Sequence, residues 1–160
     1  MKILLKIILI ILSLINISKA ELLKPNIALE PIEVLKIQLE SLKNNNVPYK
    51  DAGIEQTWEF AHPNNKQFTG PLSKFKIMMY SDNYKILLNH ASHKIEILMK
   101  TDTKHVFVVN ILTVNKINFF YEWQVSRVNY QDELEGCWLT TAVSHPRLKK
   151  EGSITTLDQI

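Results

Sequence analysis

The chain after residue 30 opens with apolar side chains at helical spacing. They recur every three or four positions, as on one face of an α-helix: Ile32, Leu35, Leu39 and Leu42. The pattern predicts a helix that begins at Glu30, with Pro31 in the first turn, where a missing N–H costs nothing. Asparagines at residues 44–46 and the following Pro48 predict its end, because asparagine favours local backbone bonding and proline cannot continue a helix.

Two shorter helices are predicted next. Asp51 is a favourable N-cap for the second, and Pro63 ends it by keeping His62 out of helical angles. After a polar loop over residues 64–69, Gly70 and Pro71 predict the start of the third. The apolar faces of these two helices are made by Ile54, Trp58 and Ala61 and by Leu72, Phe75 and Met79.

The period changes from helical to two after Tyr80. Residues 84–88 form a short apolar run that fits either a helix end or a first strand. From His93 the side chains alternate, with Ile95, Ile97 and Met99 expected on one face. Residues 106–114 are apolar on both faces, which predicts a central strand buried on both sides.

Two further strands complete the predicted sheet. Residues 119–125 alternate again, with aromatic residues on one side, after a turn at residues 115–118. A polar loop over residues 129–135 precedes a last strand over residues 136–143. Three helices followed by about four antiparallel strands indicate an α+β fold with the helices on one face of the sheet.

The organisation is that of one domain behind a leader. Residues 1–20 are predicted to be a signal peptide, because Lys2 and Lys6 precede an apolar run and Ser18 and Ala20 place small residues before a cut ahead of Glu21. That run is shorter than the ~20 residues of a spanning helix. We expect a linker over residues 21–29, the domain over residues 30–146 and a polar tail over residues 147–160. A signal peptide predicts that the protein is exported to a periplasm, to an organelle lumen or out of the cell. The alternative is that the leader remains uncleaved and anchors the protein in a membrane.

Charge and composition narrow the chemistry. The chain is 46% apolar and 22% charged, which is globular composition. Its 19 basic residues fall to 16 without the three lysines of the leader, against 16 acidic residues. A neutral domain lacks the electrostatic footprint of a nucleic-acid binder. The sequence contains no phosphate-binding glycine loop, EF-hand loop or zinc-ligand spacing, so we expect no cofactor and no metal site.

Three segments carry a resemblance to a known family: VLKIQLESLKNN at residues 34–45, DAGIEQTWEFAHPNNKQFTGPLSKF at residues 51–75, and GCWLTTAV at residues 136–143. They resemble a domain-of-unknown-function family of exported and organelle-associated proteins from bacteria and photosynthetic lineages. That family is similar to the nuclear-transport-factor-2-like, or cystatin-like, cone, in which a curved antiparallel sheet wraps around helices. The resemblance implies a pocket between sheet and helices, and in enzymes of this shape an Asp or His there acts as a base.

No set of residues converges on a catalytic pattern. Cys137 has no neighbouring cation to activate it and reads as a small buried residue. His90 is expected to pack in the core and donate to a backbone carbonyl. The candidates for lining an open pocket are therefore aromatic, with a polar edge, and no catalytic residue is assigned: Trp58, Tyr84, Asn89, His90 and Trp123.

These observations favour a non-enzymatic protein that binds a small apolar ligand or a protein partner. One alternative is a cofactor-independent isomerase or hydrolase with His90 or His93 as base, which needs a second polar group in the same cavity. Another is an accessory factor for assembly at a membrane. We expect no nucleic-acid partner and no membrane span after cleavage of the leader, and a homodimer paired through the sheets is a further expectation.

Overall fold

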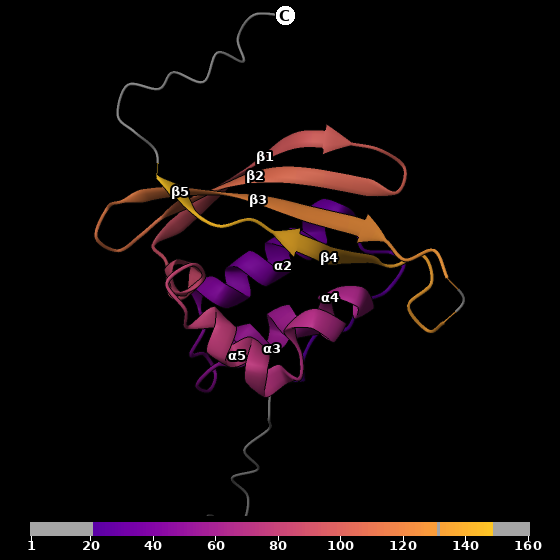
Figure 1. The fold of residues 1–160 in the computed structure, drawn as a ribbon, viewed down its shortest axis with the longest axis horizontal. Coiled ribbons are helices and arrows are strands. Elements are labelled where there is room, and N and C mark those ends of the chain that lie inside the picture. Colours follow the sequence, from indigo (N-terminus) through magenta and orange to yellow (C-terminus); the bar gives the residue numbers. More distant parts are fainter. Residues whose placement is uncertain (1–20, 131, 149–160) are drawn as a thin grey trace, which may run out of the picture.

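The computed structural model describes residues 21–130 and 132–148, and its fold is α+β (Figure 1). Helices α2 (Pro31–Lys43), α3 (Ala52–Glu59), α4 (Pro63–Thr69) and α5 (Leu72–Met79) all lie on one face of an antiparallel sheet. Helix α2 lies directly beneath the sheet, and α3 packs against the side of α2 that faces away from the sheet. The predicted leader, residues 1–20, lies outside the described residues.

Helix α2 follows the sequence prediction closely. Glu30 and Glu33 form a reciprocal capping box at its start, and Pro31 occupies the first turn. Leu35, Leu39 and Leu42 are fully buried beneath the sheet. One polar residue, Gln38, is buried on this same face.

The start of helix α3 corrects a prediction. Asp51 does precede the helix, but its side chain does not cap it; the carboxylate accepts from the hydroxyl of Tyr80 instead. The capping acceptor is Asn45, whose Oδ1 receives the N–H of Ile54 at 3.0 Å. Gly53 lies so close to α2 that a Cβ there would meet the carbonyl oxygen of Ser41 at 2.0 Å.

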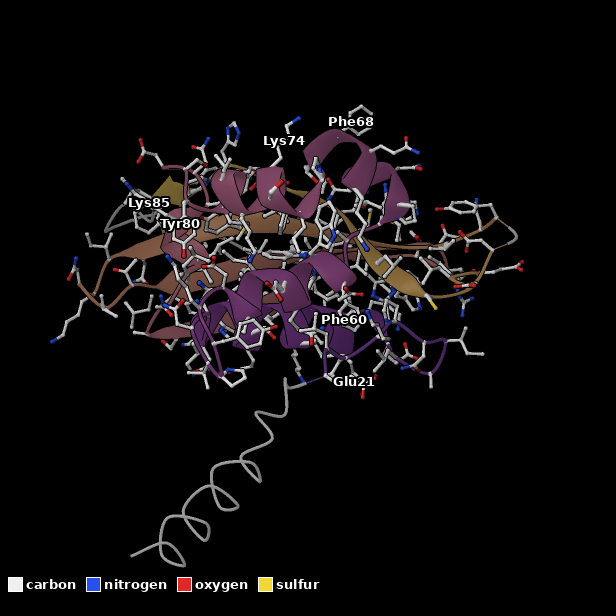
Figure 2. The ribbon with its side chains drawn as sticks, turned by 90° about the horizontal axis from the view of Figure 1, so that it is seen from below. Glu21, Phe60, Phe68, Lys74, Tyr80 and Lys85 are labelled. Carbon is white, nitrogen blue, oxygen red and sulfur yellow. The ribbon has the colours of Figure 1, made fainter. Side chains whose placement is uncertain are left out.

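Four α-helices are described rather than the three predicted, because residues 64–69 are not a loop. Pro63 stands in the first turn of α4, and His62 Nδ1 accepts the N–H of Asn64 as its cap. The helix lacks a buried apolar stripe, and Phe68 extends from it into solvent with 79% of its surface exposed (Figure 2). The ambiguous run at residues 84–88 contains a 3₁₀ turn, η1 (Lys85–Leu87).

The sheet is an antiparallel meander in the order β1–β2–β3–β4. Its strands are β1 (Ser92–Lys100), β2 (Lys104–Leu112), β3 (Asn118–Arg127) and β4 (Trp138–Val143). A register shift between Ile97 and Met99 places Met99 opposite Val106, so Met99 does not share a face with Ile95 and Ile97 as predicted. An extra residue in one strand turns the following side chains to the other face.

The two faces of β2 differ in burial, which also corrects a prediction. Phe107, Val109 and Ile111 face the helices and are fully buried. Val106 and Val108, on the other side, are only half-buried. The strand is central in the sheet, but helices cover only one of its apolar faces.

The ends of the described chain make specific contacts. Strand β5 (Arg147–Leu148) pairs with β3, so the predicted tail begins with sheet structure; its remainder lies outside the described residues. Leu23, in the predicted linker, exchanges two hydrogen bonds with the side chain of Gln56. No helix within residues 21–130 and 132–148 is long and apolar enough to cross a membrane.

Candidate functional site

A cavity of about 240 Å³ lies between the helices and the β4 side of the sheet. Each of the four described α-helices, the η1 turn with its preceding residue Tyr84, and strands β3 and β4 contribute to its wall. Its lining residues are Gln38, Thr57, Ala61, Asn65, Thr69, Phe75, Met78, Met79, Tyr84, Leu87, Trp123, Thr140, Thr141, Ala142 and Val143.

The chain between α3 and α4 closes one side of this cavity. Ala61 forms an isolated parallel bridge with Thr140 of β4. The N–H of His62 donates to the carbonyl of Thr140 at 2.8 Å, and the N–H of Thr140 donates to the carbonyl of Phe60 at 2.9 Å. These bonds satisfy part of the outer edge of β4 and fix the start of α4 against the sheet.

The polar groups of the cavity wall form a buried chain of hydrogen bonds. Trp123 Nε1–H donates to Thr140 Oγ1 at 2.9 Å, and this hydroxyl donates to Gln38 Oε1 at 2.5 Å. Gln38 Nε2–H then donates to the carbonyl of Thr57 at 3.0 Å. The chain spans β3, β4, α2 and α3, so it fixes the relative positions of the elements around the cavity.

Tyr84 connects another part of the wall to the end of β4. Its hydroxyl donates to the carbonyl of Val143 at 3.3 Å, and its ring meets that of His145 edge-on, with centroids 6.4 Å apart. Burial raises the pKa of the Tyr84 hydroxyl above its ordinary value. The phenol therefore stays protonated and acts as a donor, not as a base, at neutral pH.

Among the residues that the structure describes, the lining contains no Asp, Glu, Lys, Arg or His. The threonine hydroxyls at positions 57, 69 and 140 already donate within the protein. Asn65 differs, because its side-chain amide makes no hydrogen bond with another described residue and is half-buried in the wall. The arrangement suits a neutral ligand with an apolar body and one group that can pair with an amide.

The structure brings two of the five predicted pocket residues, Tyr84 and Trp123, to the cavity wall. Trp58 instead packs on Phe75, with ring centroids 5.0 Å apart, and is not among the lining residues. Asn89 is exposed beside α2, where its N–H donates to the carbonyl of Leu42 at 2.9 Å.

His90 also lies outside the cavity wall, in a separate polar cluster. It is buried, and its Nδ1–H donates to the carbonyl of Leu87 at 2.7 Å, as expected for a core histidine. Its Nε2 lies 2.8 Å from Nδ1 of His93, whose Nε2 lies 3.5 Å from the carboxylate of Glu40. Within the described residues no group of three His, Cys, Asp or Glu side chains could hold a metal ion.

The remaining candidates for chemistry are buried outside the cavity wall. Cys137 is a buried free thiol, and burial raises its pKa, so the reactive thiolate is disfavoured. Burial also lowers the pKa of His62 and of His105, which favours their neutral forms.

Sequence reasoning missed the polar half of the cavity. Gln38 was the available signal, because a glutamine stands on the buried face between Leu35 and Leu39. A polar side chain in such a position needs a buried partner. The partner, Thr140, is 102 residues away along the chain and could not be identified from spacing.

Comparisons of the chain with protein-family models, with curated proteins and with solved structures found no match.

Proposed function

We propose that this protein binds a small, neutral, largely apolar molecule in the cavity between its helices and β4, without catalysing a reaction. The observation that carries the proposal is the uncharged wall around a cavity of about 240 Å³. At ~30 Å³ for each liquid water, this space corresponds to about eight waters, which is the size of a small ring system. The domain is proposed to be a nuclear-transport-factor-2-like cone, supported by its helices lying on one face of an antiparallel meander.

The composition of the wall favours binding over the isomerase or hydrolase alternative. A general base must lie within hydrogen-bond reach of the bound substrate. His90 and His93 are not among the residues lining the cavity, and their rings are hydrogen-bonded to each other. Burial raises the pKa of the Tyr84 hydroxyl, which favours its protonated form. A charged ligand would leave its hydration shell without gaining an oppositely charged partner from the described wall.

A matched pair of probes tests the proposal. The neutral 2-naphthamide should bind with a Kd of about 10–100 μM, as expected for a ligand of this size. The similarly shaped anion 2-naphthoate should bind at least ~10-fold more weakly, because its charge stays unpaired. Isothermal titration calorimetry measures both. Equal affinity for the two probes, or no binding of the amide, would contradict the proposal.

Two variants locate the binding in the cavity. Ala142 is an exposed lining residue of β4, so Ala142→Phe should obstruct the cavity and weaken 2-naphthamide binding by ~10-fold or more. Ala91 is exposed and is not a lining residue, so Ala91→Phe is the matched control and should leave the affinity unchanged. Asn65→Leu should weaken binding of the amide and leave that of naphthalene unchanged. A similar loss in both phenylalanine variants would place the binding elsewhere.

We further propose that the protein acts after export, since residues 1–20 contain basic residues, an apolar run and small residues in the order typical of a signal peptide. N-terminal sequencing of the protein from its own source tests this proposal. A mature chain that begins at Glu21 is the expected result. A chain that keeps residues 1–20 would support the anchored alternative and with it an accessory role at a membrane.

A further inference from the structure

The paired imidazoles of His90 and His93 join the start of the sheet to helix α2. His93 lies on β1, and His90 lies in the turn between η1 and β1. Their ring centroids are 5.0 Å apart. The hydrogen-bonded series runs from the carbonyl of Leu87 through both rings to the carboxylate of Glu40 on α2.

The protons in this series can be counted. Both ends accept only, since one is a carbonyl oxygen and the other a carboxylate. Three links therefore need three N–H groups: one toward Leu87, one between the rings and one toward Glu40. Two neutral imidazoles carry two such protons, so the complete series holds one additional proton and one positive charge. That charge matches the single negative charge of Glu40.

We propose that His90, His93 and Glu40 form a proton-binding site, in which the imidazole pair takes up one proton and not two. A second proton would leave two N–H groups facing each other across a nitrogen–nitrogen distance of 2.8 Å, with no acceptor between them. The neutral pair loses the outermost link. The buried bond to Leu87 is kept, and the half-exposed Glu40 turns to solvent.

Burial, and after it the surrounding groups, set the direction in which the pKa of the imidazoles shifts. Burial lowers the pKa of both imidazoles, and Lys43 lowers it further, whereas Glu40 raises it. For His90 the hydrogen bond to Leu87 also raises the pKa, and the neighbouring His93 lowers it. Lys43 lies 3.8 Å from Glu40 on the same helix. On η1 the one charged side chain, Lys85, is paired with Asp82, and the β2 residue opposite His93 is the apolar Ile111. The proton is therefore taken up below the ordinary histidine value of 6.5.

The consequence for stability follows from the proton count. Below pH 6.5 the unfolded chain binds a proton on each of the two histidines, whereas the folded pair binds one at most. The unfolded state then binds more protons, so the site makes the fold less stable as the pH falls. The link to Glu40 limits this loss, because it favours the charged pair in the folded state.

Nuclear magnetic resonance of the ¹⁵N-histidine-labelled protein tests the site directly between pH 8 and pH 4.5. The expected result is one shared midpoint below pH 6.5 for His90 and His93, with one proton taken up by the pair. Glu40→Gln should lower this midpoint by about half a pH unit, since it removes the partner charge. Glu96→Gln, on an exposed position of β1, is the matched control and should leave it unchanged.

Three outcomes would overturn the proposal: two separate uptakes of one proton each, no uptake above pH 4.5, or equal midpoints in the Glu40 and Glu96 variants. Urea unfolding of the same two variants gives a second readout. The urea concentration at the midpoint of unfolding should fall between pH 7 and pH 5, and it should fall further for the Glu40→Gln protein than for the Glu96→Gln protein. Equal losses would contradict the role of Glu40. None of these results depends on the cavity or on its ligand.

Discussion

The indole N–H of Trp123 on β3 donates to the hydroxyl of Thr140 on β4, and this bond of 2.9 Å links the two strands that contribute to the cavity wall. Thr140 passes the interaction on to Gln38 of α2. One hydroxyl thus acts as acceptor and donor between two buried side chains. The hydroxyl therefore joins β3, β4 and α2, which all line the cavity.

Replacing this hydroxyl should destabilise the fold. Thr140→Val keeps the volume of the side chain but leaves Trp123 Nε1–H and Gln38 Oε1 without their partner in a buried setting. We expect the free energy of unfolding to fall by about 2–4 kcal/mol, measured by urea denaturation. Thr103→Val, at an exposed position, is the control and should change it by less than ~0.5 kcal/mol. A Thr140→Val protein as stable as the control would mean that the chain of bonds contributes little.

The close approach of α2 and α3 gives a second prediction. A Cβ at Gly53 would lie 2.0 Å from the carbonyl oxygen of Ser41, which is backbone and cannot rotate away. Gly53→Ala should therefore push the two helices apart and cost about 3 kcal/mol of unfolding free energy. Ser73→Ala, at an exposed position of α5, is the control in the same urea experiment. A loss below ~1 kcal/mol for Gly53→Ala would show that the helices separate easily.

The reactivity of Cys137 gives a third prediction. The thiol is buried, and burial raises its pKa, so the folded protein should protect it from alkylation. We expect iodoacetamide to modify the native protein at least ~1000-fold more slowly than the urea-unfolded protein, as read by mass spectrometry. Modification within tenfold of the unfolded rate would show that β4 opens locally near its start.

Local signals in the sequence were sufficient for the elements with strong periodicity. Helix α2 has a regular apolar stripe, a proline in its first turn and a clear end, and the structure follows each. Helix α4 was missed because it is short and polar; only Pro63 and the cap from His62 mark its start. The predicted face of Met99 was wrong because of the register shift after Ile97. That shift arises in the pairing of β1 with β2, so the periodicity of β1 alone does not reveal it.

The candidate site was only half predictable for a related reason. Trp123 and Tyr84 are aromatic residues within apolar segments, which predicts that they are buried. The pattern does not show which face of each ring borders the cavity. The polar wall joins Gln38 to Thr140, and the pairing of His90 with His93 and Glu40 joins the sheet to α2. Such long-range partners follow from the packing of helices on the sheet, so spacing along the chain does not reveal them.

A crystal structure of the protein grown with 2-naphthamide is the most direct test of the proposed binding site. The account predicts the ring system in the cavity, in contact with Trp123 and Met79, and its amide within hydrogen-bond distance of Asn65. A crystal of the complex with the probe bound only outside these residues, or a cavity closed around Trp123 in the presence of saturating probe, would contradict it.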